Sequence, residues 1–216
     1  MSVFKNAWSS EGFLTREHEE QRLESGKNAL KLFYEREESS GDIPAFVEKE
    51  FSFPINNPHF TPTLPSSTSG EGKREGVIKG GQGGIRVKGR WDRIDIKNGE
   101  TVIIDFKSSD IREQKDADRR AKESLQLSIY ALAYKEVYGN PPSPPFIKGG
   151  TGGIKVELHF LESGLIGRYD IEEDVLEETI VKIKEVADGI RQKIYEARPQ
   201  YIACRYCAYG EICPYQ

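Results

Sequence analysis

Two β-rich runs joined by an Asn-Gly turn limit the folds open to this sequence more than any other feature. The runs cover residues 85–97 and 101–107, and Lys97-Asn98-Gly99-Glu100 joins them. Asn-Gly adopts the positive φ angles that tight hairpin turns require. The pattern therefore predicts an antiparallel hairpin near the middle of the chain, around which the other elements must be arranged.

Helical and extended patterns alternate on both sides of this hairpin. Apolar spacing predicts helices over residues 15–37, 118–138 and 173–197, and strands over residues 45–55, 154–162 and 166–171. The apolar stripe of the last helix could serve a coiled coil, but packing on the sheet is favoured at this length. The order helix, three strands, helix, two strands, helix predicts an α/β domain with a mixed sheet.

A short repeat marks two insertions. Residues 78–87 read IKGGQGGIRV and residues 147–156 read IKGGTGGIKV. The surrounding segments, residues 57–84 and 141–153, hold 11 of the 21 glycines and 7 of the 11 prolines. Neither copy has the ending or the strand-to-helix context of a phosphate-binding loop. We interpret both as flexible loop inserts in a single domain that spans residues 1–216.

The charge balance excludes some classes of nucleic-acid-binding protein. The sequence has 31 Lys and Arg against 35 Asp and Glu, for a net charge of −4. A histone-like, globally basic binder is excluded, so contact with DNA would need a local basic surface. The N-terminus lacks a signal-peptide core, and the longest uncharged stretch is rich in polar residues and proline. We therefore expect a cytoplasmic location and no membrane partner.

The central hairpin carries the residues best suited to chemistry. Asp105 follows the apolar run Val-Ile-Ile, and Lys107, two residues on, projects from the same face of a strand. Asp92 lies on the neighbouring strand, where a hairpin can bring it opposite Asp105. Carboxylate oxygens suit Mg²⁺ or Mn²⁺, which activate water and offset phosphate charge. A lysine could orient that water or stabilise developing charge.

The alternative is that these three residues are ordinary surface charges in an ion pair. The spacing D-x₁₂-D-x-K alone does not separate the two interpretations. Gln126 and Tyr130 provide context, because they lie at i and i+4 on the next helix and so share one face.

The ordered motifs resemble a known family. Gly89-x-x-Asp92, Val-Ile-Ile-Asp105-Phe-Lys107, Gln126-x-x-x-Tyr130 and a C-terminal cysteine cluster together resemble the RecB-type nuclease domain of the PD-(D/E)XK superfamily, found in UvrD-, AddA- and AddB-like proteins. The resemblance covers residues 8–216 apart from the inserts. It implies a restriction-endonuclease-like fold, with a mixed central sheet flanked by helices.

The same resemblance implies roles for individual residues. Asp92 and Asp105 would bind the metal, Lys107 would be the catalytic lysine, and Gln126 and Tyr130 would support the site and contact nucleic acid. The implied activity is metal-dependent hydrolysis of DNA, often from strand ends, in repair or recombination. Glu48 also occupies a position that is often acidic, but we expect it to have a strand-surface role.

Three cysteines gather in the tail, residues 200–216. Cys204, Cys207 and Cys213 in a cytosolic chain favour a metal over disulfides. Their spacing resembles part of the iron–sulfur motif of RecB-type nucleases, which uses four thiolates. The set here is incomplete, since the chain has three cysteines. A structural zinc site and simple free thiols are the alternatives.

A second ligand of the family also has no counterpart. Its Gly-x-x-x-His motif would place a histidine four residues after Gly26, where the sequence has Leu30. We expect His18 to be a solvated helical residue and His159 a strand residue, while His59 falls in the first insert. Because the histidine and the fourth cysteine would both lie upstream, we expect the sequence to lack the domain's N-terminal segment, which another chain could supply.

Two functional hypotheses follow. One is a Mg²⁺- or Mn²⁺-dependent DNA exonuclease, which the intact set of Asp92, Asp105 and Lys107 favours. The other is a catalytically weak nucleic-acid-binding module associated with a helicase partner, which the missing ligands favour.

Overall fold

The computed structural model describes residues 2–55, 84–97, 100–139 and 154–215. They fall into two compact units, Met1–Ile180 and Val181–Gln216. The repeat-bearing inserts lie outside the described residues, apart from Gly84. That the two units act as one domain stays a prediction. No helix among the residues described is both long and apolar enough to cross a membrane.

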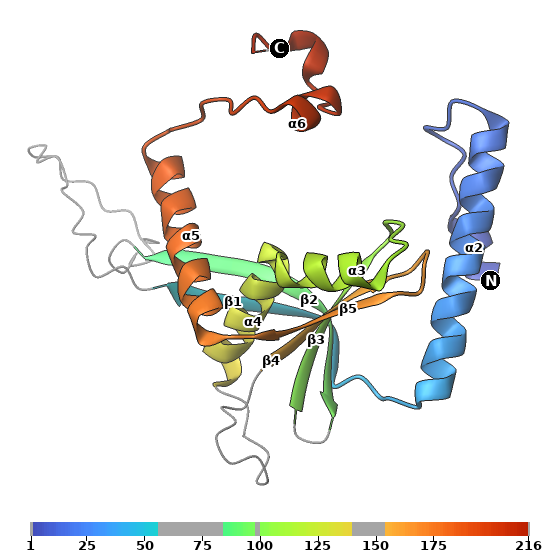
Figure 1. Ribbon diagram of the computed structural model, residues 1–216, viewed down its shortest axis with the longest axis horizontal. Coiled ribbons are helices and arrows are strands. Elements are labelled where there is room, and N and C mark those ends of the chain that lie inside the picture. Colours follow the sequence, from blue (N-terminus) through green and yellow to red (C-terminus); the bar gives the residue numbers. More distant parts are fainter. Residues whose placement is uncertain (1, 56–83, 98–99, 140–153, 216) are drawn as a thin grey trace, which may run out of the picture. The chain divides into compact units, whose positions relative to one another are not determined.

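A five-stranded mixed sheet forms the centre of the first unit (Figure 1). Its order follows the sequence: β1 (Phe46–Ile55), β2 (Ile85–Lys97), β3 (Glu100–Lys107), β4 (Ile154–Phe160) and β5 (Ile166–Ile171). All neighbours are antiparallel except β3 and β4, which are parallel. The predicted central hairpin and the predicted mixed sheet are confirmed.

Two helices connect β3 to β4. We predicted one helix over residues 118–138, but the chain forms α3 (Gln114–Lys122) and α4 (Leu125–Tyr138). Ser124 separates them, because its side chain accepts a hydrogen bond from the backbone N–H of Leu127 and so caps the start of α4. Side-chain capping of this kind starts a new helix where the preceding one ends.

Helix α4 covers one face of the sheet with aromatic contacts. The indole of Trp91, fully buried on β2, donates a hydrogen bond of 3.0 Å to the carbonyl of Tyr130. Phe51 on β1 packs edge-to-face on the Tyr130 ring, and Thr101 on β3 bonds the Tyr134 hydroxyl. These contacts fix the rotation of α4 over the sheet.

Helix α3 lies close against β5. Gln114 donates to the carbonyl of Ile166 at 2.7 Å, and Asp118 accepts from the backbone N–H of Arg168 at 3.0 Å. Gly167 allows this approach, because a Cβ atom there would lie 2.0 Å from the carbonyl oxygen of Ala117.

Helix α2 (Arg16–Ser40) contacts the opposite face of the sheet from α4. Thr15 caps its start and Gly41, with φ of 64°, ends it three residues later than predicted. Its contacts include the ring pair Phe33–Phe106 and the ion pair between Glu37 and Arg93. Before it, the short helix α1 (Ser2–Ala7) places the Phe4 ring over Gly26.

The last part of the chain departs from the sequence prediction. Helix α5 (Glu173–Arg191) ends six residues before the predicted boundary. Its stripe is buried at Leu176, but Ile190 and Ile194 are more than half exposed. The short helices α6 (Tyr201–Arg205) and η1 (Gly210–Ile212), which follow in the second unit, were not predicted.

We expect Gly167→Ala to lower the free energy of unfolding by about 1–3 kcal/mol, the usual cost of overpacking, because the new methyl meets backbone that cannot move aside easily. Urea denaturation measures the change. Gly189→Ala is the matched control: its Cβ meets nothing within 4 Å in the interior of α5, so it should stabilise by about 0.5–1 kcal/mol. Equal effects of the two substitutions would contradict the close packing of α3 on β5.

Candidate active site

The site forms where the pairing of β1 with β2 is interrupted. Val47 pairs with Arg93 and Lys49 pairs with Trp91, but Glu48 between them is unpaired. Glu48 has φ of 50°, an uncommon backbone conformation for a residue other than glycine. Strained residues of this kind cluster at functional sites. Asp92 is the β2 residue that lies between the same two pairs.

Asp92 turns from β2 toward the end of β3. The pairing of β2 with β3 ends at Arg93 and Ile104, so the strands separate just before Asp92. One carboxylate oxygen of Asp92 then accepts a hydrogen bond of 3.1 Å from the backbone N–H of Phe106. The bond places Asp92 beside Asp105, as the sequence predicted.

Asp105, Lys107 and Gln126 form a closed triangle of contacts. The Lys107 ammonium lies 2.6 Å from Oδ2 of Asp105 and donates to Oε1 of Gln126 at 2.7 Å. Gln126 in turn donates to Oδ1 of Asp105 at 2.7 Å. A side chain from the first turn of α4 therefore holds both strand residues, which requires the helix break at Ser124.

Tyr130 completes the cluster from one turn further along α4. Its hydroxyl accepts a hydrogen bond of 3.0 Å from Gln126. The ring is nearly buried and packs on Phe51. All five residues predicted for the site, Asp92, Asp105, Lys107, Gln126 and Tyr130, are thus brought together; their catalytic roles stay predictions.

Burial controls the electrostatics of the cluster. Loss of water raises the pKa of Asp105 above its ordinary value, the Lys107 ammonium offsets part of that rise, and the nearby Asp92 adds to it. Burial also raises the pKa of the Tyr130 hydroxyl; the charges of Asp92, Asp105 and Glu48 reinforce the rise and the hydrogen bond from Gln126 opposes it. The cluster therefore holds buried negative charge that a bound cation would stabilise.

The two aspartates fit a hard divalent cation. Oδ2 of Asp105 is buried, and among the described residues its contact is the ion pair of 2.6 Å with the Lys107 ammonium. Mg²⁺ is commonly held by one or two carboxylates, with water and substrate phosphate completing its shell. Within the residues described, no group of three or more His, Cys, Asp or Glu side chains could hold a metal ion. The site therefore offers two protein carboxylates.

The cysteines and histidines have other surroundings. Cys204, Cys207 and Cys213 are free thiols, and where the structure describes the chain they are not gathered for a metal. His159 is buried on β4 with its ring 2.7 Å from Glu157, and His18 packs on the Phe13 ring. These positions agree with the strand and helix roles predicted for the two histidines.

Two features of the site were missed or undervalued in the sequence. The backbone N–H of Phe106 positions Asp92, and no sequence pattern signals such a bond. Glu48 was expected on the strand surface; it is exposed there, but its ion pair of 2.8 Å with Arg90 and its positive φ link it to the site. Glu48 shares its strand with Glu50, and the local sequence signalled neither property.

Comparison with known proteins decides the family. A family model described as the PD-(D/E)XK nuclease superfamily matches residues 2–214. The chain belongs to this superfamily. Membership and the mixed sheet confirm the predicted α/β, restriction-endonuclease-like fold. Superfamily nucleases typically use divalent metals such as Mg²⁺.

Individual relatives of this PD-(D/E)XK chain are distant. The "Gene 69 protein" of Mycobacterium phage L5 is 26% identical over 133 residues, which cover 61% of this chain and 40% of that protein. The crystal structure of SSO0001 matches with a TM-score of 0.46 and 19% identity, over 90% of this chain and 70% of that one. The narrower resemblance to RecB-type domains stays a prediction.

We expect Asp105→Asn to increase the free energy of unfolding at neutral pH. A pKa raised by folding means that stability present below the unfolded pKa is lost as pH rises through the folded value. Asparagine removes this titration and keeps an acceptor for Gln126. The gain should vanish at pH values below the ordinary aspartate range, and urea unfolding across pH without metal measures it.

Asp110→Asn is the control, because Asp110 is half exposed and should show little difference across the same pH series. A loss of stability in Asp105→Asn at neutral pH would mean that the ion pair with Lys107 outweighs the cost of burial.

Proposed function

We propose that this chain is a metal-dependent nuclease that hydrolyses phosphodiester bonds in DNA. The observation that carries the proposal is the buried carboxylate of Asp105, whose Oδ2 lies 2.6 Å from the Lys107 ammonium and which has Asp92 beside it. Membership of the PD-(D/E)XK superfamily supports it.

Asp92 and Asp105 would hold Mg²⁺ or Mn²⁺ through their carboxylates. A bound ion lowers the pKa of a coordinated water and neutralises charge on the scissile phosphate. Asp92 is oriented for this by its bond to Phe106, and Asp105 by its bond to Gln126.

Lys107 would act next to the ion. Its ammonium is held by Gln126 and Asp105, with about one third of the side chain exposed to incoming substrate. There it can orient a water molecule or stabilise negative charge that develops on the phosphate. Gln126 and Tyr130 position these groups, because Gln126 contacts Asp105, Lys107 and the Tyr130 hydroxyl.

The resemblance to RecB-type domains supports a narrower proposal: an exonuclease that acts in DNA repair or recombination, with a helicase partner. The second candidate is a weak or inactive domain that binds nucleic acid for such a partner. This second candidate is favoured because the described residues offer two carboxylates and no larger group of metal ligands.

We expect cleavage of linear DNA that requires Mg²⁺ or Mn²⁺ and is abolished by EDTA. Lys107→Ala and Asp105→Ala should each reduce the rate by about 10²–10³-fold or more, the loss typical of removing one transition-state contact. Gel analysis of end-labelled DNA measures both rate and polarity.

Lys31→Ala is the control, since this lysine is exposed on α2 and should leave the rate unchanged. Equal rates for wild type and Lys107→Ala would reject the catalytic assignment and favour the second candidate.

The tail yields a separate expectation. We propose that Cys204, Cys207 and Cys213 are an incomplete iron–sulfur ligand set, with zinc as the alternative and free thiols as the third outcome. Anaerobically purified protein should contain less iron than one four-iron cluster per chain, by elemental analysis and absorption spectroscopy. A full, stable cluster in the isolated monomer would contradict an incomplete set.

A further inference from the structure

Beyond the metal site, β2 carries a row of cations on one face. Arg86, Lys88 and Arg90 alternate along the strand and are all exposed, and the next residue in the series is Asp92. Side chains two residues apart on a strand lie on one face, about 6.6–6.8 Å from each other. The row therefore ends two residues before Asp92 of the candidate active site.

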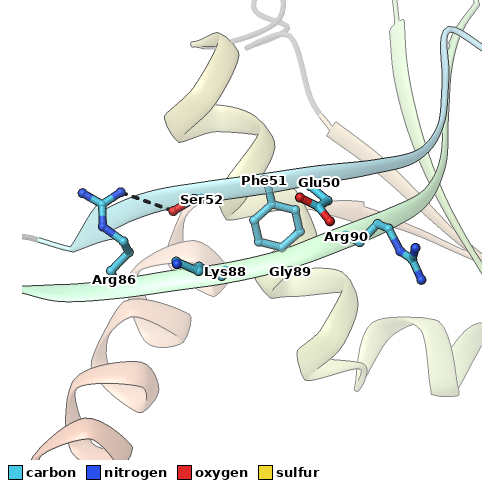
Figure 2. Close-up of a pocket in the computed structure, with 7 residues that line it drawn as sticks. All are labelled: Glu50, Phe51, Ser52, Arg86, Lys88, Gly89 and Arg90. Carbon is cyan, nitrogen blue, oxygen red and sulfur yellow. Dashed lines mark hydrogen bonds between the residues drawn. The ribbon is translucent and has the colours of Figure 1, made fainter.

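These cations line a groove on the β1–β2 ribbon. Glu50, Phe51 and Ser52 of β1 form the other side, and Gly89 lies between the cations on β2 (Figure 2). All the residues that line the groove come from β1 and β2. The two strands pair Phe51 with Gly89 and Ser52 with Lys88. We name this surface the β2 basic groove.

Most of the positive charge in the groove is not neutralised. Arg86 bonds the Ser52 hydroxyl at 3.2 Å, and Lys88 has no ion-pair partner among the residues that the structure describes. Arg90 pairs with Glu48, and Glu50 lies across from it on β1. Negative charge is thus confined to the end nearest Asp92, while the distal end is cationic in a chain with a net charge of −4.

The groove is continuous with the candidate active site. The ring of Phe51 lies against Gly89, where a Cβ would come within 2.5 Å of it, and packs edge-to-face on Tyr130 at 5.8 Å. Glu48 links the two regions a second time, since it pairs with Arg90 and its charge raises the pKa of Tyr130. A ligand along the groove would therefore arrive beside Glu48, which pairs with Arg90, and beside Asp92, two residues further along β2.

We propose that the β2 basic groove binds the phosphodiester backbone of one strand of the nucleic-acid substrate and leads it to Asp92. The proposal rests on the proposed function, since it names how the same site receives its polymer. Arg86 and Lys88 bind phosphates furthest from the metal site and Arg90 nearest to it. The six residue steps from Arg86 to Asp92 span about 20 Å of strand, so the contact needs an oligonucleotide rather than a single nucleotide.

The test measures binding and catalysis separately. Binding is followed by fluorescence anisotropy in EDTA, with a labelled single-stranded DNA of about 16 nucleotides, over a series of salt concentrations. The triple variant Arg86→Ala/Lys88→Ala/Arg90→Ala should bind roughly tenfold more weakly or worse. Its plot of log affinity against log salt should be about two units less steep, because three phosphate contacts are lost.

The matched control removes the same charge elsewhere. Arg16, Lys31 and Arg119 are exposed on α2 and α3, and their joint replacement by Ala should leave the affinity and the salt slope close to wild type. Lys88→Glu is a milder second variant that disrupts no ion pair among the described residues and should also weaken binding. The proposal would be overturned if the groove triple variant lost no more affinity than the control triple variant, or if its salt slope equalled that of wild type.

A short chromogenic diester, thymidine 5′-(p-nitrophenyl phosphate), distinguishes hydrolysis at the candidate active site from strand binding in the groove. It is too short to reach Arg86 and Lys88, so the double variant Arg86→Ala/Lys88→Ala should hydrolyse it at the wild-type rate while Asp105→Ala does not. If the wild type hydrolyses neither this diester nor DNA with any metal, the proposed function fails even where strand binding is seen. If wild type cleaves it and the triple variant binds strands normally, only the groove proposal fails.

Discussion

The burial of one charged carboxylate, that of Asp105, determines how the rest of this fold is arranged. A carboxylate that has left water must be paired or hydrogen-bonded. Lys107 supplies the charge from the same strand, and Gln126 supplies the hydrogen bond from α4. The connection between β3 and β4 must therefore deliver a helix start to this point, which the break at Ser124 does.

Aromatic packing gives this polar cluster its rigidity. Trp91 is fully buried and bonds the backbone of α4 at Tyr130, so β2 and α4 are joined at the residue that ends the cluster. Gln126 lies one turn before Tyr130, and its rotation over the sheet follows from that bond. Polar side chains that are positioned by buried aromatic packing keep a fixed geometry. Surface ion pairs could not fix it, because they are weak and screened by salt.

Much of this arrangement could be predicted from the sequence, and the reasons for the misses are local. The pairing of β2 with β3 and the alternation of the strands follow from turn preference and period, so the mixed sheet was accessible. The break between α3 and α4 was missed because Leu127 and its neighbours are apolar on several faces, which hid the capping role of Ser124. The positive φ of Glu48 and the bond from Phe106 to Asp92 depend on tertiary pairing, and no local pattern encodes them.

Helix α2 shows a different balance of forces. Of its 25 residues only Ala29 is buried, so apolar area contributes little to its attachment. Near its C-terminal end the Glu37–Arg93 pair is shielded from salt because Arg93 is buried, whereas the Arg22–Glu162 pair nearer the start is partly exposed and screened. Close to the Glu37 end, the Phe33 ring packs on Phe106, the residue whose backbone N–H bonds Asp92. Higher ionic strength would weaken the attachment at the start of the helix first and leave the contact behind the candidate metal site in place.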